Sequence, residues 1–106
     1  IPIQESDVST AWLAFPVLVN KEAPFSRKQF QIYLEERNIQ TRVVFTGNIL
    51  RQPMCKGIKK RVTLNGLQNS DEVMERGVLL PLHHGMTSEM FKRLHDCIDE
   101  FVAKNS

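Results

Sequence analysis

The segment from Thr41 to Pro53 changes character partway along, and this change limits what the chain can form more than any other feature. Its first part, Thr41 to Phe45, is rich in β-branched residues and ends in an aromatic residue, which is typical of a strand. Its second part, Gly47 to Pro53, contains glycine, asparagine and proline, which favour turns and loops. The sequence therefore predicts a strand over Gln40 to Phe45 that runs directly into a loop.

The side chains of this loop are suited to binding a polar ligand. Arg51 is a planar cation, and Asn48 and Gln52 add amide donors beside the ring of Phe45. Such groups fit a phosphate or a sugar hydroxyl, and Arg42 on the strand adds a second guanidinium. We expect Asn48 and Arg51 to hold a substrate rather than the fold. The plainer alternatives are solvated surface arginines, an ordinary turn asparagine and a core phenylalanine.

A strand and a helix are predicted upstream of this segment. Ala11 to Val19 is apolar and aromatic, and Pro16 within it indicates an edge strand or a bulge. Trp12 and Phe15 are an odd number of residues apart, so a regular strand places one in the core and the other on the opposite face. Ser26 is a good N-cap for a helix from Arg27 to about Arg37, and the apolar stripe of this helix is Phe30, Tyr33 and Leu34. Asn38 can take the left-handed conformation that ends a helix.

Downstream, the residues from Gly47 to Leu67 show little periodicity beyond a short helical turn around Leu50 to Cys55. A short helix through Asp71 to Arg76, capped by Asn69 or Ser70, and a third strand over Val78 to Leu82 are predicted next. Thr87 caps the last helix, which has Glu89 in its first turn. Apolar residues then recur at helical spacing, at Met90, Phe91, Leu94, Cys97, Ile98, Phe101 and Val102.

The expected order is therefore strand, helix, strand, loop, helix, strand, helix. This order predicts an α+β fold in which a small sheet of about three strands is covered on one face by helices. The 106 residues form one domain, and 42% hydrophobic and 25% charged residues are ordinary for a globular protein.

Composition also argues against several classes of protein. A net charge of +2 is too small to indicate nucleic-acid binding, and the basic residues Lys56, Lys59, Lys60 and Arg61 are read as a solvated cluster or a weak steering patch. No apolar run is long enough for a membrane helix. Cys55 and Cys97 have no metal-ligand spacing, and His83 and His84 have no further ligands, so we expect no metal. Two reduced thiols are consistent with a cytoplasmic protein.

Taken with Trp12 to Pro16 and with Leu80-Pro81-Leu82-His83, the segment Phe45 to Pro53 resembles one known family. The chain is similar to the C-terminal small domain of the DegT/DnrJ/EryC1/StrS family, which comprises pyridoxal-phosphate-dependent aminotransferases and dehydratases of nucleotide-linked sugars. The loop looks nearest to the CDP-4-keto-6-deoxyglucose 3-dehydrase branch, whereas Leu80 to His83 has the general aminotransferase form. His84 departs from the family pattern, which has a proline at that position.

The resemblance implies that residues 1–106 complete the sugar-binding side of an active site in deoxysugar and O-antigen biosynthesis. The residues that it places at the substrate are Trp12, Phe15, Arg42, Phe45, Asn48, Arg51 and Gln52. The family keeps aromatic residues in the strand of Trp12 and Phe15, close to the cofactor.

The cofactor, pyridoxal phosphate or pyridoxamine phosphate, would be held by a lysine, or faced by the histidine that replaces it, in a large domain absent from this chain. We therefore expect this chain alone to be inactive and to bind no cofactor. Its expected partners are its own large domain, a second subunit of a homodimer and a nucleotide-linked deoxyhexose.

Two alternatives to this hypothesis remain at this point. The chain is compatible with a free-standing α+β regulatory module that binds a small ligand, because a fold alone does not determine function. A nucleic-acid module is less well supported, since the basic residues lack interleaved aromatic residues.

Overall fold

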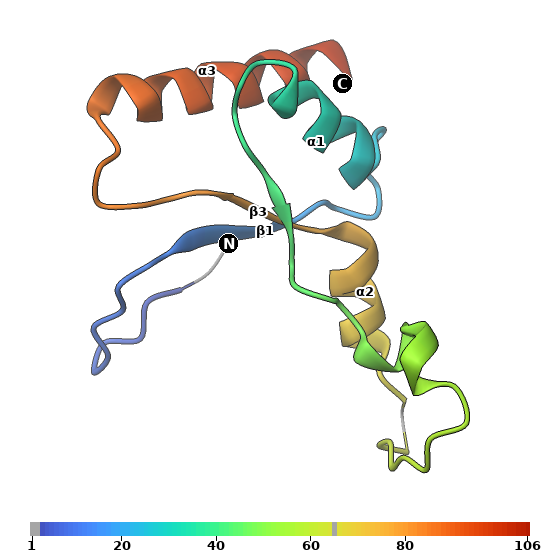
Figure 1. The fold of residues 1–106 in the computed structure, drawn as a ribbon. Helices are drawn as coiled ribbons and strands as arrows, with labels where there is room; N and C mark the ends of the chain where they lie inside the picture. Colours follow the sequence, from blue (N-terminus) through green and yellow to red (C-terminus); the bar gives the residue numbers. More distant parts are fainter. Residues whose placement is uncertain (1–2, 65) are drawn as a thin grey trace.

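A computed structural model describes residues 3–64 and 66–106 and shows the predicted α+β fold (Figure 1). The elements in chain order are β1 Ala14–Leu18, α1 Arg27–Glu35, β2 Arg42–Val43, the 3-10 turns η1 Ile49–Arg51 and η2 Pro53–Cys55, α2 Gln68–Arg76, β3 Gly77–Pro81 and α3 Ser88–Lys104. Among the described residues, no helix is both long enough and apolar enough to cross a membrane.

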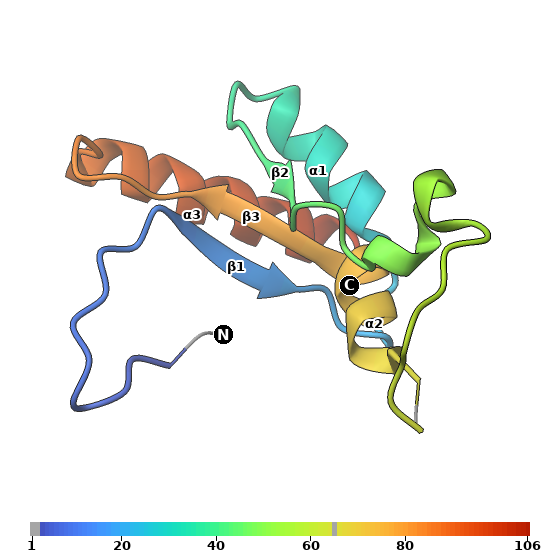
Figure 2. The ribbon, with the colours of Figure 1, turned by 60° about the horizontal axis from the view of Figure 1, so that its bottom comes forward.

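The strands form an antiparallel sheet in the order β1-β3-β2, so β3 lies in the middle (Figure 2). Phe15 is opposite Leu80, Val17 is opposite Val78, and Val43 is also opposite Val78. Pro16 lies within β1, an edge strand, which confirms one of the two predictions for that residue, because an edge position tolerates a missing N–H donor.

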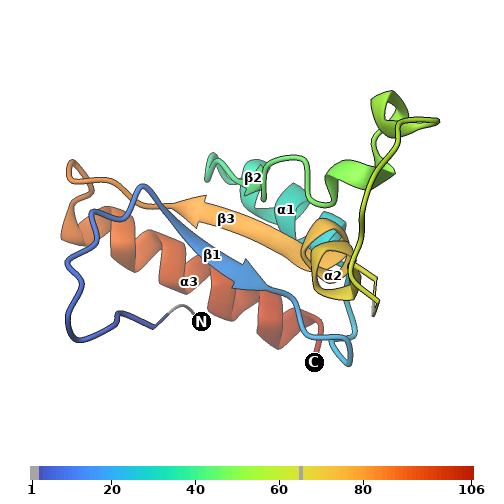
Figure 3. The same ribbon diagram turned by 90° about the horizontal axis from the view of Figure 1, so that it is seen from below.

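Helices α1 and α3 cover one face of this sheet, as predicted (Figures 2 and 3). The core between the layers consists of Phe30, Leu34, Ile39, Val78, Leu80, Leu94 and Phe101. The ring of Phe101 contacts the rings of Phe25, Phe30 and Tyr33, with centroids 4.7, 5.3 and 4.9 Å away. The stripe predicted for α1 therefore meets part of the stripe predicted for α3 and the alternate residues of β1 and β3. The prediction is wrong for Met90, Phe91 and Val102, which are exposed.

The helix ends follow local signals in three cases out of the four predicted. Ser26 forms a capping box with Gln29, and Thr87 accepts a hydrogen bond from the Met90 N–H. Asn38 has a φ of 59°, which confirms the left-handed residue after α1. The prediction that Asn69 or Ser70 caps α2 is wrong, because this helix begins at Gln68, preceded by Leu67 without a side-chain cap.

Several predicted boundaries are also wrong. The first strand begins at Ala14 rather than Ala11, α1 ends at Glu35 rather than Arg37, and β3 lies one residue earlier than predicted. The largest error is the strand predicted over Gln40 to Phe45, of which only Arg42–Val43 pairs with β3.

Side-chain contacts account for the shortened β2. The Thr41 N–H donates to Glu35 Oε1 at 2.5 Å, and the Thr41 hydroxyl donates to the same oxygen at 2.9 Å, so this backbone donor is used by a helix rather than by a strand. At the other end, Phe45 has a φ of 47°, which no strand residue adopts. The hydrogen bonds of Thr41 therefore prevent the strand from starting earlier, and the backbone of Phe45 prevents it from extending further.

Candidate functional site

Residues 44–52, here called the 44–52 loop, leave the end of β2 and run beside α2 (Figure 1). The loop is closed by its own hydrogen bonds: the Gly47 N–H donates to Val44 O at 2.9 Å, and Gln52 Nε2 donates to Thr46 O at 3.0 Å. Asn48 Oδ1 accepts from the Leu50 N–H at 3.0 Å and so caps η1. The short helical turn predicted in this region is confirmed, as η1 followed by η2.

Asp71 on α2 binds two of the predicted site residues at once. Its Oδ1 accepts from Arg51 Nε at 2.9 Å and its Oδ2 accepts from Arg51 Nη2 at 2.7 Å, which is a bidentate pair. The same Oδ1 accepts from Asn48 Nδ2 at 2.8 Å. Arg51 and, to a smaller degree, Asn48 thereby lower the pKa of the Asp71 carboxyl to about 2.

These contacts change the expectation for Asn48 and Arg51. Asn48 is only 3% exposed, and its amide is bonded on both sides within the protein. The expectation that these residues hold a substrate rather than the fold is therefore wrong about the fold for the buried Asn48, and the binding of a substrate by either residue stays a prediction. Arg51 nevertheless keeps 64% of its side chain exposed, so its guanidinium remains accessible to a ligand.

A glycine places the loop directly against α2. Gly47 has a φ of 62°, and a Cβ built on it would lie 2.4 Å from Met74 Cβ, which is far inside van der Waals contact. Only glycine fits both the left-handed backbone and this approach. The loop therefore meets α2 at two positions along the helix, Asp71 and Met74.

Phe45 projects from the same loop into solvent. Its side chain is 88% exposed, and its left-handed backbone is uncommon for a bulky residue. Positive φ angles outside glycine often occur at functional positions. The ring borders a hollow of about 280 Å³ whose lining is Val44, Phe45, Gly47, Asn69, Ser70 and Val73. The alternative in which Phe45 belongs to the core is therefore wrong.

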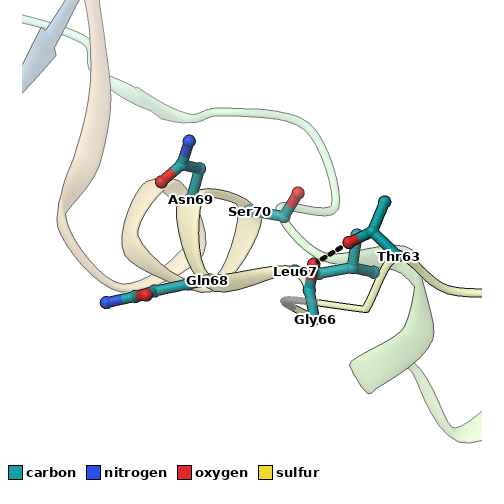
Figure 4. Close-up of a pocket in the computed structure, with 6 residues that line it drawn as sticks. All are labelled: Thr63, Gly66, Leu67, Gln68, Asn69 and Ser70. Atoms are coloured by element: carbon teal, nitrogen blue, oxygen red, sulfur yellow. Dashed lines mark hydrogen bonds between the residues drawn. The ribbon is translucent and has the colours of Figure 1, made fainter.

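A second hollow, of about 420 Å³, lies at the start of α2 and shares Asn69 and Ser70 with the first (Figure 4). Its other lining residues are Thr63, Gly66, Leu67 and Gln68. The Thr63 hydroxyl donates to Gly66 O at 2.5 Å, and Gln68 points away from that pair (Figure 4). The start of α2 thus presents uncharged polar groups beside the 44–52 loop.

The remaining predicted site residues lie elsewhere on the sheet. Arg42 is opposite Leu79 in the register, which puts it on the face that α1 and α3 leave open, and it is exposed. Phe15 packs against the core, as expected for one of the two aromatic residues of the first strand. Trp12 precedes β1 and is 37% exposed, so the predicted alternation of faces does not apply to it. Phe45, Asn48, Arg51 and Gln52 share one loop, whereas Trp12 belongs to the opposite edge of the sheet.

Other polar clusters do not form a site of their own. The basic residues Lys56, Lys59, Lys60 and Arg61 are exposed. His83 Nδ1 accepts a hydrogen bond from the Gly85 N–H at 3.1 Å, which stabilises the turn after β3. Across residues 3–64 and 66–106, no group of histidine, cysteine and acidic side chains is arranged to hold a metal ion.

Comparison with curated proteins gives two close sequence matches. The chain is 34% identical over 106 residues to dTDP-4-dehydro-2,6-dideoxy-D-glucose 3-dehydratase of Saccharopolyspora spinosa, covering 100% of the chain and 23% of that protein. It is 30% identical over 102 residues to the lipopolysaccharide biosynthesis protein RfbH of Salmonella typhimurium, covering 96% of the chain and 23% of that protein. The chain thus spans about a quarter of the length of these relatives.

A solved structure supports the fold. The chain superposes on GDP-4-keto-6-deoxymannose-3-dehydratase, determined with a trapped PLP-glutamate geminal diamine, with a TM-score of 0.76 and 22% identity over 89% of the chain and 24% of that protein. A family model matches residues 1–99. The chain therefore belongs to the DegT/DnrJ/EryC1/StrS aminotransferase family.

Proposed function

We propose that this chain is the C-terminal small domain of a pyridoxal-phosphate-dependent enzyme acting on a nucleotide-linked deoxyhexose. The enzyme is a 3-dehydratase or an aminotransferase of deoxysugar and O-antigen biosynthesis. Support comes from the family match and from the names of the two sequence relatives, each of which is about four times as long as this chain. In this proposal a large domain precedes the chain, and the enzyme is a cytoplasmic homodimer.

The observation that carries the proposal is the exposed guanidinium of Arg51 on a loop that is fixed to α2. A rigid loop that presents a cation gives up little conformational entropy when it binds an anionic group. We assign Arg51 to the diphosphate or sugar of the substrate, with Arg42, Phe45 and Gln52 as further contacts. Asn48 serves the same site through the shape of the loop, because its amide is buried.

The cofactor belongs to the large domain in this proposal. A pyridoxal enzyme holds its cofactor through a Schiff-base lysine, and the bound cofactor would supply the electron sink for the reaction. Lys56, Lys59 and Lys60 are exposed, and the proposal gives none of these residues the Schiff-base role. The proposed contribution of this chain is to bind and orient the substrate.

Exposed apolar residues support docking onto the rest of the enzyme. Trp12 and Leu13 precede β1 and are 37% and 89% exposed, and Phe45 and Ile49 on the 44–52 loop are 88% and 47% exposed. The two pairs lie at opposite edges of the sheet and so form two separate exposed apolar surfaces, and an exposed apolar surface often marks an interface. We propose that the large domain and a second subunit cover these residues.

Kinetics of the full-length enzyme test the proposal. Arg51→Ala should raise KM for the nucleotide sugar about 10- to 150-fold, which is the usual loss when a hydrogen bond to a charged group is removed. Arg51→Lys should recover only part of this loss, because an ammonium cannot reproduce the bidentate fork of the guanidinium. Lys28→Ala, which removes an exposed cation from α1, is the control. An unchanged KM in Arg51→Ala would reject the substrate-binding role of the loop.

The alternative function, a free-standing regulatory module, makes a different prediction. Such a module should bind a nucleotide or an amino acid by itself, whereas an isolated small domain should bind either one poorly. Isothermal titration of the 106-residue chain against both ligand classes separates the two. Tight binding of either ligand would favour the regulatory module.

A further inference from the structure

We infer that Asp71 is a positioning residue for substrate binding: its carboxylate orients Arg51 so that the outer edge of the guanidinium faces the anionic group of the substrate. The inference rests on the proposed function and deepens it. It concerns a residue on α2, outside the loop that contains the proposed substrate contacts.

The geometry of the ion pair determines which part of Arg51 remains available. A guanidinium has five N–H donors in one plane. Asp71 binds the side edge, through Nε and Nη2. The outer edge, between Nη1 and Nη2, is not used by Asp71 and offers parallel N–H groups to a phosphate. Asp71 therefore selects one edge of the cation for the ligand.

The same carboxylate also fixes the backbone that carries Arg51. Asp71 Oδ1 accepts from Asn48 Nδ2, and Asn48 in turn caps η1, the turn that ends at Arg51. The close approach of Gly47 to Met74 holds the loop at a second position on the helix. Direction and location of the guanidinium thus both depend on α2.

Helix α2 is itself anchored at its C-terminal end, so it is a firm support. The Val19 N–H donates to Arg76 O at 3.1 Å, and Arg76 donates in return to Val19 O. Arg76 also pairs with Glu72 on the same helix. Because the last residue of α2 is bonded to the residue that follows β1, Asp71 has a defined place relative to the sheet.

The inference can be tested because the position and the charge of the Asp71 carboxylate have opposite effects on the affinity for the substrate. A carboxylate next to Arg51 weakens its attraction for an anion, so removing only the charge would tighten substrate binding. Loss of orientation would weaken binding instead, since misplaced groups contribute little. A role confined to folding would leave substrate binding unchanged.

The test compares Asp71→Asn with Glu75→Gln in the full-length enzyme. Glu75 is an exposed residue of the same helix, so its variant removes an equal charge outside the network. We expect Asp71→Asn to raise KM for the nucleotide sugar about tenfold or more, with kcat within about twofold of the wild-type value, and Glu75→Gln to match the wild type. We also expect the double variant Arg51→Ala/Asp71→Asn to have a KM no higher than that of Arg51→Ala alone, because without Arg51 the carboxylate has no guanidinium to orient.

Each outcome decides between the inferences. A KM in Asp71→Asn that equals or falls below the wild-type value would overturn the positioning role, as would multiplying effects in the double variant. If Arg51→Ala raises KM and Asp71→Asn does not, only the positioning role fails; if Arg51→Ala has no effect, the proposed function fails first.

Should Asp71→Asn not fold, Asp71→Glu keeps the charge but moves the carboxylate. Its KM is expected to rise at least about threefold, and a wild-type KM would refute the inference.

Discussion

Replacing Gly47 with alanine should destabilise the protein far more than the same replacement at Gly57. Both glycines have left-handed backbones, with φ angles of 62° and 77°. They differ in their surroundings, because a Cβ at Gly47 meets Met74 Cβ at 2.4 Å, whereas a Cβ at Gly57 has no atom of residues 3–64 and 66–106 within 4 Å beyond its chain neighbours. The pair therefore separates the backbone strain of alanine from the loss of the contact between the 44–52 loop and α2.

The size of the difference follows from these two effects. Left-handed backbone costs an L-residue roughly 1–2 kcal/mol, and this cost applies to both variants. Forcing a methyl group into a packed contact adds about 1–3 kcal/mol at Gly47 only. A domain of this size loses about 4 °C in melting temperature for each kcal/mol. We expect a decrease of roughly 4–8 °C for Gly57→Ala and roughly 8–20 °C for Gly47→Ala.

Thermal unfolding of the 106-residue chain, followed by circular dichroism, measures this difference. Kinetics of the full-length enzyme provide a second measurement, since a displaced loop should raise KM in Gly47→Ala and leave it unchanged in Gly57→Ala. Equal melting temperatures for the two variants would refute the argument that the 44–52 loop is held against Met74.

Two further predictions concern the core and the Asp71 ion pair. Leu34→Ala, at a side chain with 0% exposure, should lower the free energy of unfolding by about 2–5 kcal/mol in urea denaturation, whereas Ile32→Ala, at an exposed position of the same helix, should cost less than about 1 kcal/mol. The folded-state pKa of Asp71, about 2, lies below its usual value, so the stability that its ion pair contributes is fully present above about pH 4 and is lost as the pH falls toward 2. Urea midpoints measured from pH 5 to pH 2 should therefore fall less steeply in Asp71→Asn than in the wild type, and parallel curves would contradict the assigned pKa.

Features with short-range causes could be predicted from the sequence. The caps at Ser26 and Thr87 and the left-handed Asn38 depend on residues within a few positions, and each is confirmed. The spacing of apolar residues in α3 also predicts which side of the helix is buried, and Leu94 and Phe101 on that side lie in the core. The order of helices and strands could also be predicted, because the spacing of apolar residues in each segment matches either a helix or a strand.

Features that depend on side-chain contacts between one element and the next could not be predicted in the same way. Thr41 belongs to a strand-like run, but the carboxylate of Glu35 on α1 uses its N–H. Phe45 has strong strand propensity, yet it is exposed on a left-handed backbone where the chain turns toward α2. In both cases a tertiary contact outweighs a local preference of about 1 kcal/mol or less.

Asp71 shows why one residue of the candidate site was missed. In the sequence it is one acidic residue in the first turn of a short helix, where an acid is favoured for its interaction with the helix dipole. Its actual partners, Arg51 and Asn48, lie 20 and 23 residues earlier in the chain. A loop whose side chains suit phosphate can be recognised from composition, whereas the carboxylate that orients them can be recognised only once the fold has brought α2 beside the loop. The residues proposed to bind the substrate therefore lie on the 44–52 loop, and the residue that positions them lies on α2. Only variants that change one of these without the other can separate their effects on substrate binding.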